Sequence, residues 1–101
     1  MPKLSGKRVA ILVAEGFEQV EMTGPRRALQ EAGAETFIVS PATQDEVQGW
    51  NHFDKGERFH VDVPLGQADA ANFDALLLPG GVANPDQLRT KPQAVQFVRQ
   101  F

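Results

Sequence analysis

The sequence predicts an α/β fold with a mostly parallel sheet. Two stretches, 8–14 and 74–78, each consist of one charged residue followed by an uninterrupted apolar run, which is typical of strands that are buried on both faces. A segment of helical composition at 18–32 separates the first run from a further apolar strand at 36–40. Strand, helix and strand within about thirty residues form a βαβ unit, whose crossover is almost always right-handed.

The ends of these elements are marked by glycine and proline. The first strand stops at Glu15-Gly16, and the helix stops before Gly33, a typical residue just past a helix C-terminus. Pro25 lies within the helical segment, so the helix either begins there or is kinked. Pro41 closes the second strand.

A β-hairpin that projects from the main sheet is predicted next. Residues 47–50 and 58–63 are β-prone and are separated by a polar tract that includes Asp54-Lys55-Gly56. Apolar and polar residues alternate in the second stretch, which predicts a half-exposed strand. The apolar set is Phe59, Val61 and Val63, and the polar set is His60 and Asp62.

The C-terminal third predicts a helical turn at 67–72, a third buried strand at 74–78 and a helix after it. Asn84-Pro85 is a typical helix start, and Pro92 restarts the helix. Four apolar residues then share one helical face: Ala94, Val95, Val98 and Phe101.

Composition excludes several classes of protein. With 101 residues, 42% of them apolar, the chain suffices for one compact domain and not for two. The net charge of −3 argues against a nucleic-acid or anionic-membrane surface. The longest apolar run, Val9–Ala14, is too short for a membrane span or a signal peptide, so we expect a soluble, cytoplasmic protein. Because there is no cysteine, disulfides, thiolate metal sites and a cysteine nucleophile are excluded within these residues.

Two loops are placed where ligands bind in an open α/β sheet, beyond the carboxyl ends of the strands. The first, at 15–21, carries three glutamates, of which Glu18 and Glu21 would share a face of a helical turn. Acidic residues also stabilise a helix N-terminus, which is the alternative explanation. The second loop, at 79–86, contains Gly80 and Gly81, whose N–H groups could stabilise an oxyanion or simply form a tight turn.

The histidines do not indicate a metal site. His52 and His60 lie in the hairpin near Asp54 and Glu57, in a spacing that fits no usual metal motif. A solvated hairpin face explains them, and we predict no metal and no cofactor. Trp50 is either a core residue or an anchor in a subunit contact.

Two stretches of the sequence resemble signatures of the ThiJ/PfpI superfamily. The first is Val9-Ala-Ile-Leu-Val-Ala-Glu-Gly-Phe-Glu-Gln-Val-Glu21, and the second is Asp74-Ala-Leu-Leu-Leu-Pro-Gly-Gly81 with Asn84-Pro85-Asp86. The stretch Val47-Gln-Gly-Trp-Asn-His52 resembles the PfpI-type bacterial stress proteins. The resemblance implies a flavodoxin-like three-layer sandwich (class I glutamine amidotransferase-like), of which residues 1–101 are the N-terminal portion of a single domain. It also implies a homodimer or a higher homo-oligomer.

Members of that superfamily are cysteine-dependent peptidases, glyoxalases, deglycases or redox-sensing chaperones. By position, Glu21 matches the glutamate that hydrogen-bonds the cysteine, and Glu18 is the neighbouring acid. Gly80 and Gly81 match the backbone segment that faces the cysteine as an oxyanion hole. Asp86 falls near an acid that some members present to the neighbouring subunit, one residue further from the glycine pair than in those members.

The cysteine elbow of that superfamily follows the helix that ends this sequence. The resemblance therefore implies part of a stress-response enzyme that acts on peptides, proteins or small carbonyl compounds, with its nucleophile beyond this chain. We expect the 101 residues alone to be inactive. A chaperone-like binding module is the alternative, acting through an apolar face of Val95, Val98 and Phe101. A receiver-like or flavin-binding domain ranks last, because a receiver needs an acid where Pro79-Gly80-Gly81 stands.

Overall fold

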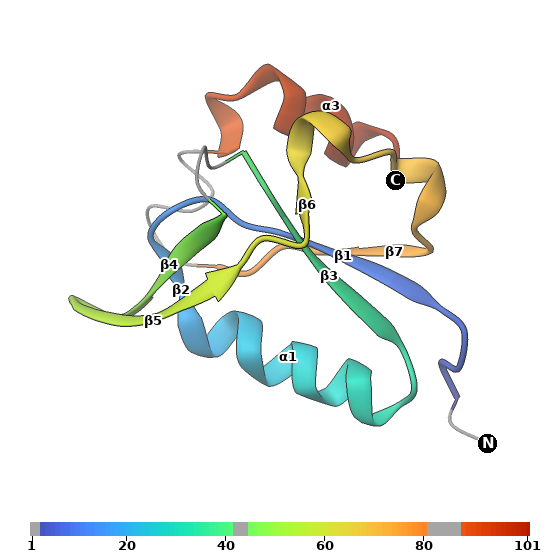
Figure 1. Ribbon diagram of the computed structural model, residues 1–101, viewed down its shortest axis with the longest axis horizontal. Coiled ribbons are helices and arrows are strands. Elements are labelled where there is room, and N and C mark those ends of the chain that lie inside the picture. The colour runs from blue at the N-terminus through green and yellow to red at the C-terminus, as the bar shows by residue number, and fades with distance from the viewer. Residues whose placement is uncertain (1–2, 42–44, 81–87) are drawn as a thin grey trace.

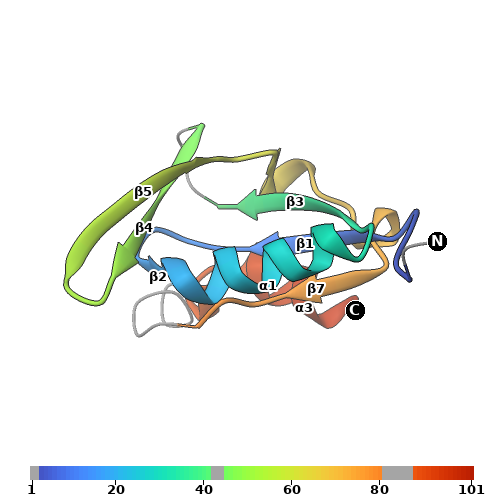
Figure 2. The same ribbon diagram turned by 90° about the horizontal axis from the view of Figure 1, so that it is seen from below.

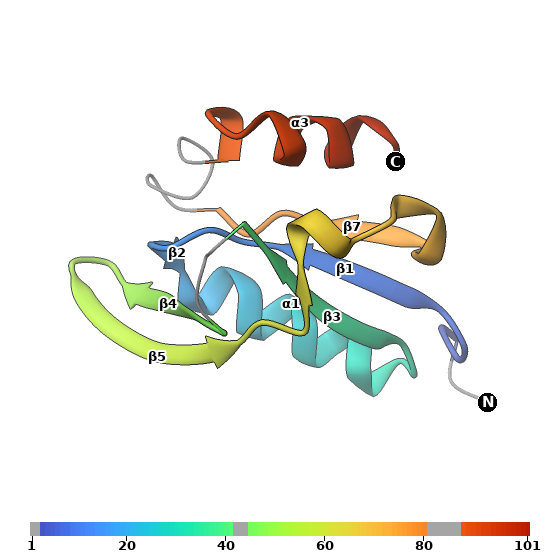
Figure 3. The same ribbon diagram turned by 45° about the horizontal axis from the view of Figure 1, so that its top comes forward.

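A computed structural model describes residues 3–41, 45–80 and 88–101 of the chain. Its main sheet has four parallel strands in the order β6-β3-β1-β7. These strands are Arg8–Leu12 (β1), Glu35–Ser40 (β3), Val63–Pro64 (β6) and Ala75–Leu77 (β7). The helices Gln19–Glu31 (α1) and Pro92–Arg99 (α3) cover opposite faces of this sheet (Figure 1). This arrangement confirms the α/β fold class and its three layers, which Figure 3 shows from the side.

The strand β1 lies inside the sheet because its side chains are apolar on both faces. Ala10 and Leu12 pack in a cluster beneath α3, whereas Ile11 and Val13 pack in a second cluster with Met22 of α1. All of these side chains are buried. The uninterrupted apolar run is therefore explained by two cores that share one strand.

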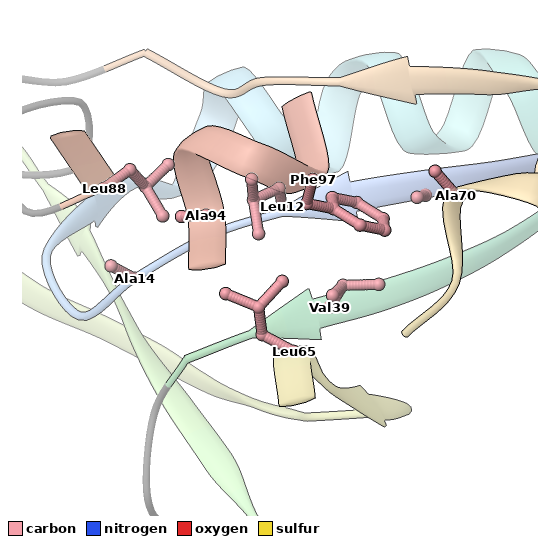
Figure 4. Packing of buried hydrophobic residues seen from close by; sticks show 9 residues of the cluster. Leu12, Ala14, Val39, Leu65, Ala70, Leu88, Ala94 and Phe97 are labelled. Carbon is pink, nitrogen blue, oxygen red and sulfur yellow. The ribbon is translucent and has the colours of Figure 1, made fainter. Parts of the chain in front are cut away.

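The core beneath α3 is formed by side chains from the sheet, the helix and the connections between them (Figure 4). Phe97 and Ala94 of α3 point inward onto Leu12 and Val39 (Figure 4). The buried face of α3 therefore consists of Ala94 and Phe97, with Val95 and Val98 half-buried at its sides. The predicted stripe omitted Phe97, whose ring also meets the ring of Phe101 edge to face, with centroids 5.1 Å apart.

The helix α1 begins at Gln19 and contains Pro25. Its C-terminus is followed by Gly33, which has a φ of 99°. This left-handed conformation confirms the predicted role of that glycine in ending the helix.

The hairpin is part of a second sheet. The strands Phe17–Glu18 (β2), Glu46–Asn51 (β4) and Asp54–His60 (β5) pair in the order β2-β4-β5 (Figure 2). The turn lies at His52 and Phe53, and His52 has a φ of 59°. The predicted polar connection was wrong, because Asp54-Lys55-Gly56 extends β5 instead of forming the turn.

The alternation of buried and exposed residues predicted for 58–63 is present, but these residues belong to two strands, β5 and β6, and not to one. Phe59 and Val61 are buried, and His60 and Asp62 are exposed. Val63 belongs to β6 in the main sheet. The predicted helical turn at 67–72 is a pair of 3₁₀ turns, Leu65–Gln67 and Ala70–Asn72.

Strand β7 differs from the prediction of a third buried strand. Ala75 is exposed, and Leu76 and Leu77 are only partly buried. The physical reason is its place in the sheet, since β1 is its one neighbour among the residues that the structure describes. The predicted helix start at Asn84-Pro85 lies outside the described residues.

Candidate active site

The first predicted loop and the described start of the second, Pro79-Gly80, meet at the carboxyl ends of β1 and β7, which are adjacent parallel strands. The backbone N–H of Glu18 donates a hydrogen bond to the carbonyl oxygen of Gly80, at 3.2 Å. The loop after β1 is thereby attached to the loop after β7. Residues that are more than sixty positions apart in sequence meet here.

Glu21 lies in the first turn of α1, and its carboxyl group lies against Gly80. A Cβ atom added at Gly80 would lie 3.0 Å from the Glu21 Cδ and closer still to Oε1. Gly80 is not among the described glycines with positive φ. A side chain at Gly80 would therefore displace the Glu21 carboxyl group from its present position, whereas the backbone conformation of Gly80 would admit other residues.

The Glu18 carboxyl group does not lie against Gly80 as that of Glu21 does. Its Oε2 accepts a hydrogen bond from the backbone N–H of His52, at 3.0 Å. The expectation of one shared helical face is wrong because Glu18 precedes the helix and is extended, with φ −74° and ψ 116°. The three-residue spacing that places side chains together in a helix does not apply across a strand-to-helix junction.

Two neighbours of Glu18 also bind the hairpin. Glu15 Oε2 accepts from the Gln48 N–H at 3.0 Å, and Gln19 Oε1 accepts from the Glu57 N–H at 2.7 Å. No such role was predicted for Glu15 or Gln19 from the sequence. No local pattern could have found it, because the partners lie more than thirty residues away.

Gln48 fixes the hairpin from within. Its side chain is buried, and its Nε2 donates to the carbonyl oxygens of Gly49 and Gly56, both at 2.8 Å. Arg58 forms two ion pairs: its Nε lies 3.3 Å from Glu46 Oε1, and its Nη2 lies 3.9 Å from Glu15 Oε1. The first loop is thus hydrogen-bonded to the hairpin on one side, while Glu21 faces Gly80 on the other.

Two predicted site residues, Gly81 and Asp86, lie outside the described residues. The hairpin side chains His52, Asp54 and His60 are exposed, as a solvated face requires. Across 3–41, 45–80 and 88–101, no group of three or more His, Asp or Glu residues is placed to hold a metal. Trp50 is half-buried on β4 and pairs with Glu18 of β2.

The described helices are also too short or too polar to cross a bilayer.

Comparison with known proteins finds relatives in Staphylococcus epidermidis and Bacillus subtilis. The chain is 45% identical over 83 residues to the protein SERP1413 of Staphylococcus epidermidis, which covers 82% of this chain and 45% of that protein. It is 37% identical over 95 residues to YraA of Bacillus subtilis, provisionally named a cysteine protease, covering 94% of this chain and 53% of YraA. The chain therefore spans about half the length of the curated relatives that it matches.

Solved structures also match the fold of this chain. The DJ-1 superfamily protein STM1931 of Salmonella typhimurium, crystallised as a cysteine-to-alanine mutant, superposes with a TM-score of 0.81 and 29% identity. The match covers 93% of this chain and 49% of that one. The protein VC2308 superposes with a TM-score of 0.84 and 27% identity, over 94% of this chain and 46% of that one. The family model of the DJ-1/PfpI family matches residues 7–101, and the chain belongs to that family.

Proposed function

We propose that this chain supplies the supporting groups of a cysteine-dependent DJ-1/PfpI site, while the nucleophile belongs to polypeptide that these residues do not include. The observation that carries the proposal is the contact between the Glu21 carboxyl and Gly80. The carboxyl orients and tunes the sulfur, and the backbone at Gly80 and Gly81 holds the negative charge that develops on a substrate carbonyl.

The different contacts of the three glutamates support Glu21 as the partner of the nucleophilic sulfur. Glu15 and Glu18 are engaged by backbone N–H groups of the hairpin. Glu21 is exposed, and its carboxyl is directed toward the second loop. An acid that is already bound to the scaffold is less available to a sulfur atom than one that faces the loop.

The reaction class follows from the chemistry of a thiolate. A thiolate attacks an electrophilic carbonyl, and the resulting oxyanion needs donors that are fixed in advance. We therefore propose a peptide, a protein or a small carbonyl adduct as the substrate, in a homo-oligomeric enzyme. The provisional naming of YraA as a cysteine protease is consistent with this class.

The experiment is a chimera in which this chain replaces the matching part of YraA. The rate of thiol alkylation by iodoacetamide is measured against pH. Glu21→Gln keeps the size of the side chain and removes its charge, so we expect the midpoint of the pH profile to move by about one unit. Glu18→Gln is the matched control and should leave the midpoint in place. If Glu18→Gln moves the midpoint and Glu21→Gln does not, the wrong acid has been assigned.

A binding module is the second candidate, and one observation favours it. Leu78, which follows β7, is 48% exposed although it is apolar, and it lines an apolar groove together with Val95 and Val98 of α3. Exposed apolar surface of this kind recruits partners without chemistry. If the chimera binds unfolded protein but processes no peptide or carbonyl adduct, the binding function is the correct one.

A further inference from the structure

The helix α1 begins without help from the side chain of its N-cap residue. That residue is Glu18, which forms no capping hydrogen bond in the described part of the chain and accepts from the N–H of His52 instead. The first N–H groups of a helix have no partner within the helix, so an uncapped first turn tends to fray. Glu21 lies in this first turn. Its place against Gly80 therefore depends on what else holds the start of α1.

Gln19, the first residue of α1, is bound to the hairpin, which Figure 2 shows beside the start of the helix. Its Oε1 accepts a hydrogen bond from the backbone N–H of Glu57, at 2.7 Å. The side chain passes two glycines of the hairpin. A Cβ atom added at Gly49 would lie 3.3 Å from the Gln19 Cβ, and one added at Gly56 would lie 3.1 Å from the Gln19 Cδ and closer still to Oε1. A methyl group at Gly56 would therefore displace the Gln19 amide group from Glu57.

The partner of Gln19 lies at an irregularity of the hairpin. Strand β5 has one residue more than β4 between two pairs of opposed residues, Gln48 with Arg58 and Trp50 with Lys55. Such a β-bulge disrupts the ladder locally and is over-represented next to active sites. Here the Glu57 N–H donates to the Gln19 side chain, and the Gly56 carbonyl oxygen accepts from Gln48 Nε2 at 2.8 Å. Side chains thus bind the backbone where the ladder is irregular.

We propose that Gln19 is a positioning residue for Glu21. The hydrogen bond from Glu57 fixes the first residue of α1 on the hairpin, and Glu21 follows two positions later in the same turn. On the other side, the N–H of Glu18 donates to the Gly80 carbonyl oxygen at 3.2 Å. The start of α1 is held between the hairpin and the second loop, and both attachments direct the Glu21 carboxyl toward Gly80. The importance of this placement rests on the proposed function, in which Glu21 tunes the sulfur.

The test uses the chimera with YraA and two substitutions that break the same hydrogen bond from opposite sides. Gln19→Met keeps the length of the side chain and removes its acceptor oxygen. Gly56→Ala keeps Gln19 and adds a methyl group where its amide group now lies. In both variants we expect exchange of the Glu57 amide to accelerate by about fivefold, because its hydrogen bond is lost.

The consequences are measured at Glu21 and at the thiol. The ¹³C shift of the Glu21 carboxyl carbon should change in both variants, because the carboxyl moves away from Gly80. The midpoint of thiol alkylation against pH should move in the same direction as in Glu21→Gln, by about half a unit, which is about threefold in thiolate fraction below the midpoint.

Gln30→Met is the matched control, because it removes a glutamine hydrogen bond at the opposite end of the same helix. The Gln30 Nε2 donates to Thr36 Oγ1 at 3.0 Å. We expect this substitution to leave both the Glu21 carboxyl shift and the midpoint unchanged. Equal changes in Gln30→Met and Gln19→Met would overturn the inference, since the effect would then belong to the helix as a whole.

A lower melting temperature of Gln19→Met with an unchanged Glu21 carboxyl shift would also overturn it, because Gln19 would then serve stability alone. So would unchanged exchange of the Glu57 amide, because the hydrogen bond itself would be absent. If Glu21→Gln moves the midpoint and Gln19→Met does not, the inference is wrong and the proposed function stands. If Gln19→Met changes the Glu21 carboxyl shift but Glu21→Gln leaves the midpoint in place, the proposed function alone is wrong.

Discussion

Glu18 and Glu21 differ by three positions in sequence and have different surroundings. Glu18 accepts a hydrogen bond from the N–H of His52, a turn residue with positive φ, whereas Glu21 lies against Gly80. A non-glycine residue with positive φ is uncommon, and a carboxylate bound to its N–H helps to hold it in that conformation. Glu18 therefore stabilises the hairpin, and Glu21 is left to face the second loop.

This difference is testable by amide exchange. Glu18→Ala should accelerate exchange of the His52 amide by about tenfold, because a hydrogen bond to a charged group is lost. Glu21→Ala, the control, should leave the same amide unchanged. Equal effects of the two substitutions would contradict the separation of their roles.

Gly80→Ala should displace the Glu21 carboxyl. The added methyl group would occupy the place of that carboxyl, which is at the end of a flexible, exposed side chain. We therefore expect less than about 1 kcal/mol of destabilisation together with a changed ¹³C shift of the Glu21 carboxyl carbon. The control is Gly66→Ala, since a Cβ there meets no atom within 4 Å. An unchanged shift in Gly80→Ala would show that the two residues are not in contact.

At the scale of the element, α1 has one glycine inside it and one after its C-terminus, and the two have opposite effects on the helix. Gly24 lies inside the helix with open space around it, and Gly33 follows the helix with a φ of 99°. Alanine is a better helix former than glycine by about 1 kcal/mol, but a Cβ is unfavourable at positive φ.

Gly24→Ala should therefore slow amide exchange in α1, and Gly33→Ala should accelerate it, each by about fivefold. Native-state hydrogen exchange measures both variants under one set of conditions. Slower exchange in Gly33→Ala would show that the helix does not need a left-handed residue at its end.

At the scale of the whole molecule, the chain is compact although it spans about half of its relatives. Its radius of gyration is 12.9 Å, close to the value of about 13 Å that is typical of a folded chain of 100 residues. Two cores lie on opposite faces of β1, so the sheet is covered on both sides. Among the described residues, one edge of β7 has no partner strand, and an apolar groove of about 360 Å³ lies between Leu78 and Pro79 on one side and Val95 and Val98 of α3 on the other.

We expect the chain alone to bind a hydrophobic dye at this groove. The groove should give the dye signal, because burying one apolar side chain against the dye is worth about 1.5–3 kcal/mol. Leu78→Ser should weaken dye binding to the isolated chain, and Val20→Ser should not. A sharp, concentration-independent melt of the chain without dye binding would contradict this expectation.

The sequence by itself determined the elements that depend on local pattern. The apolar runs of β1 and β3, the left-handed Gly33 and the proline at the start of α3 could all be predicted, because each reflects a backbone preference or a period within a few residues. The candidate pair of Glu21 and Gly80 came from the family resemblance, and its role in a reaction stays a prediction.

The tertiary structure alone decided where the three glutamates of the first loop are directed, that β7 lies at an edge and that the hairpin turns at His52. Apolar character tells that a strand is buried somewhere, but not which neighbours it has. The turn was missed because Asp54-Lys55-Gly56 is a stronger local turn signal than His52-Phe53. In the structure, the pairing of β4 with β5 outweighs that local preference and places Asp54-Lys55-Gly56 in a strand. These features depend on contacts between residues that are distant in sequence, whose energies no local pattern contains.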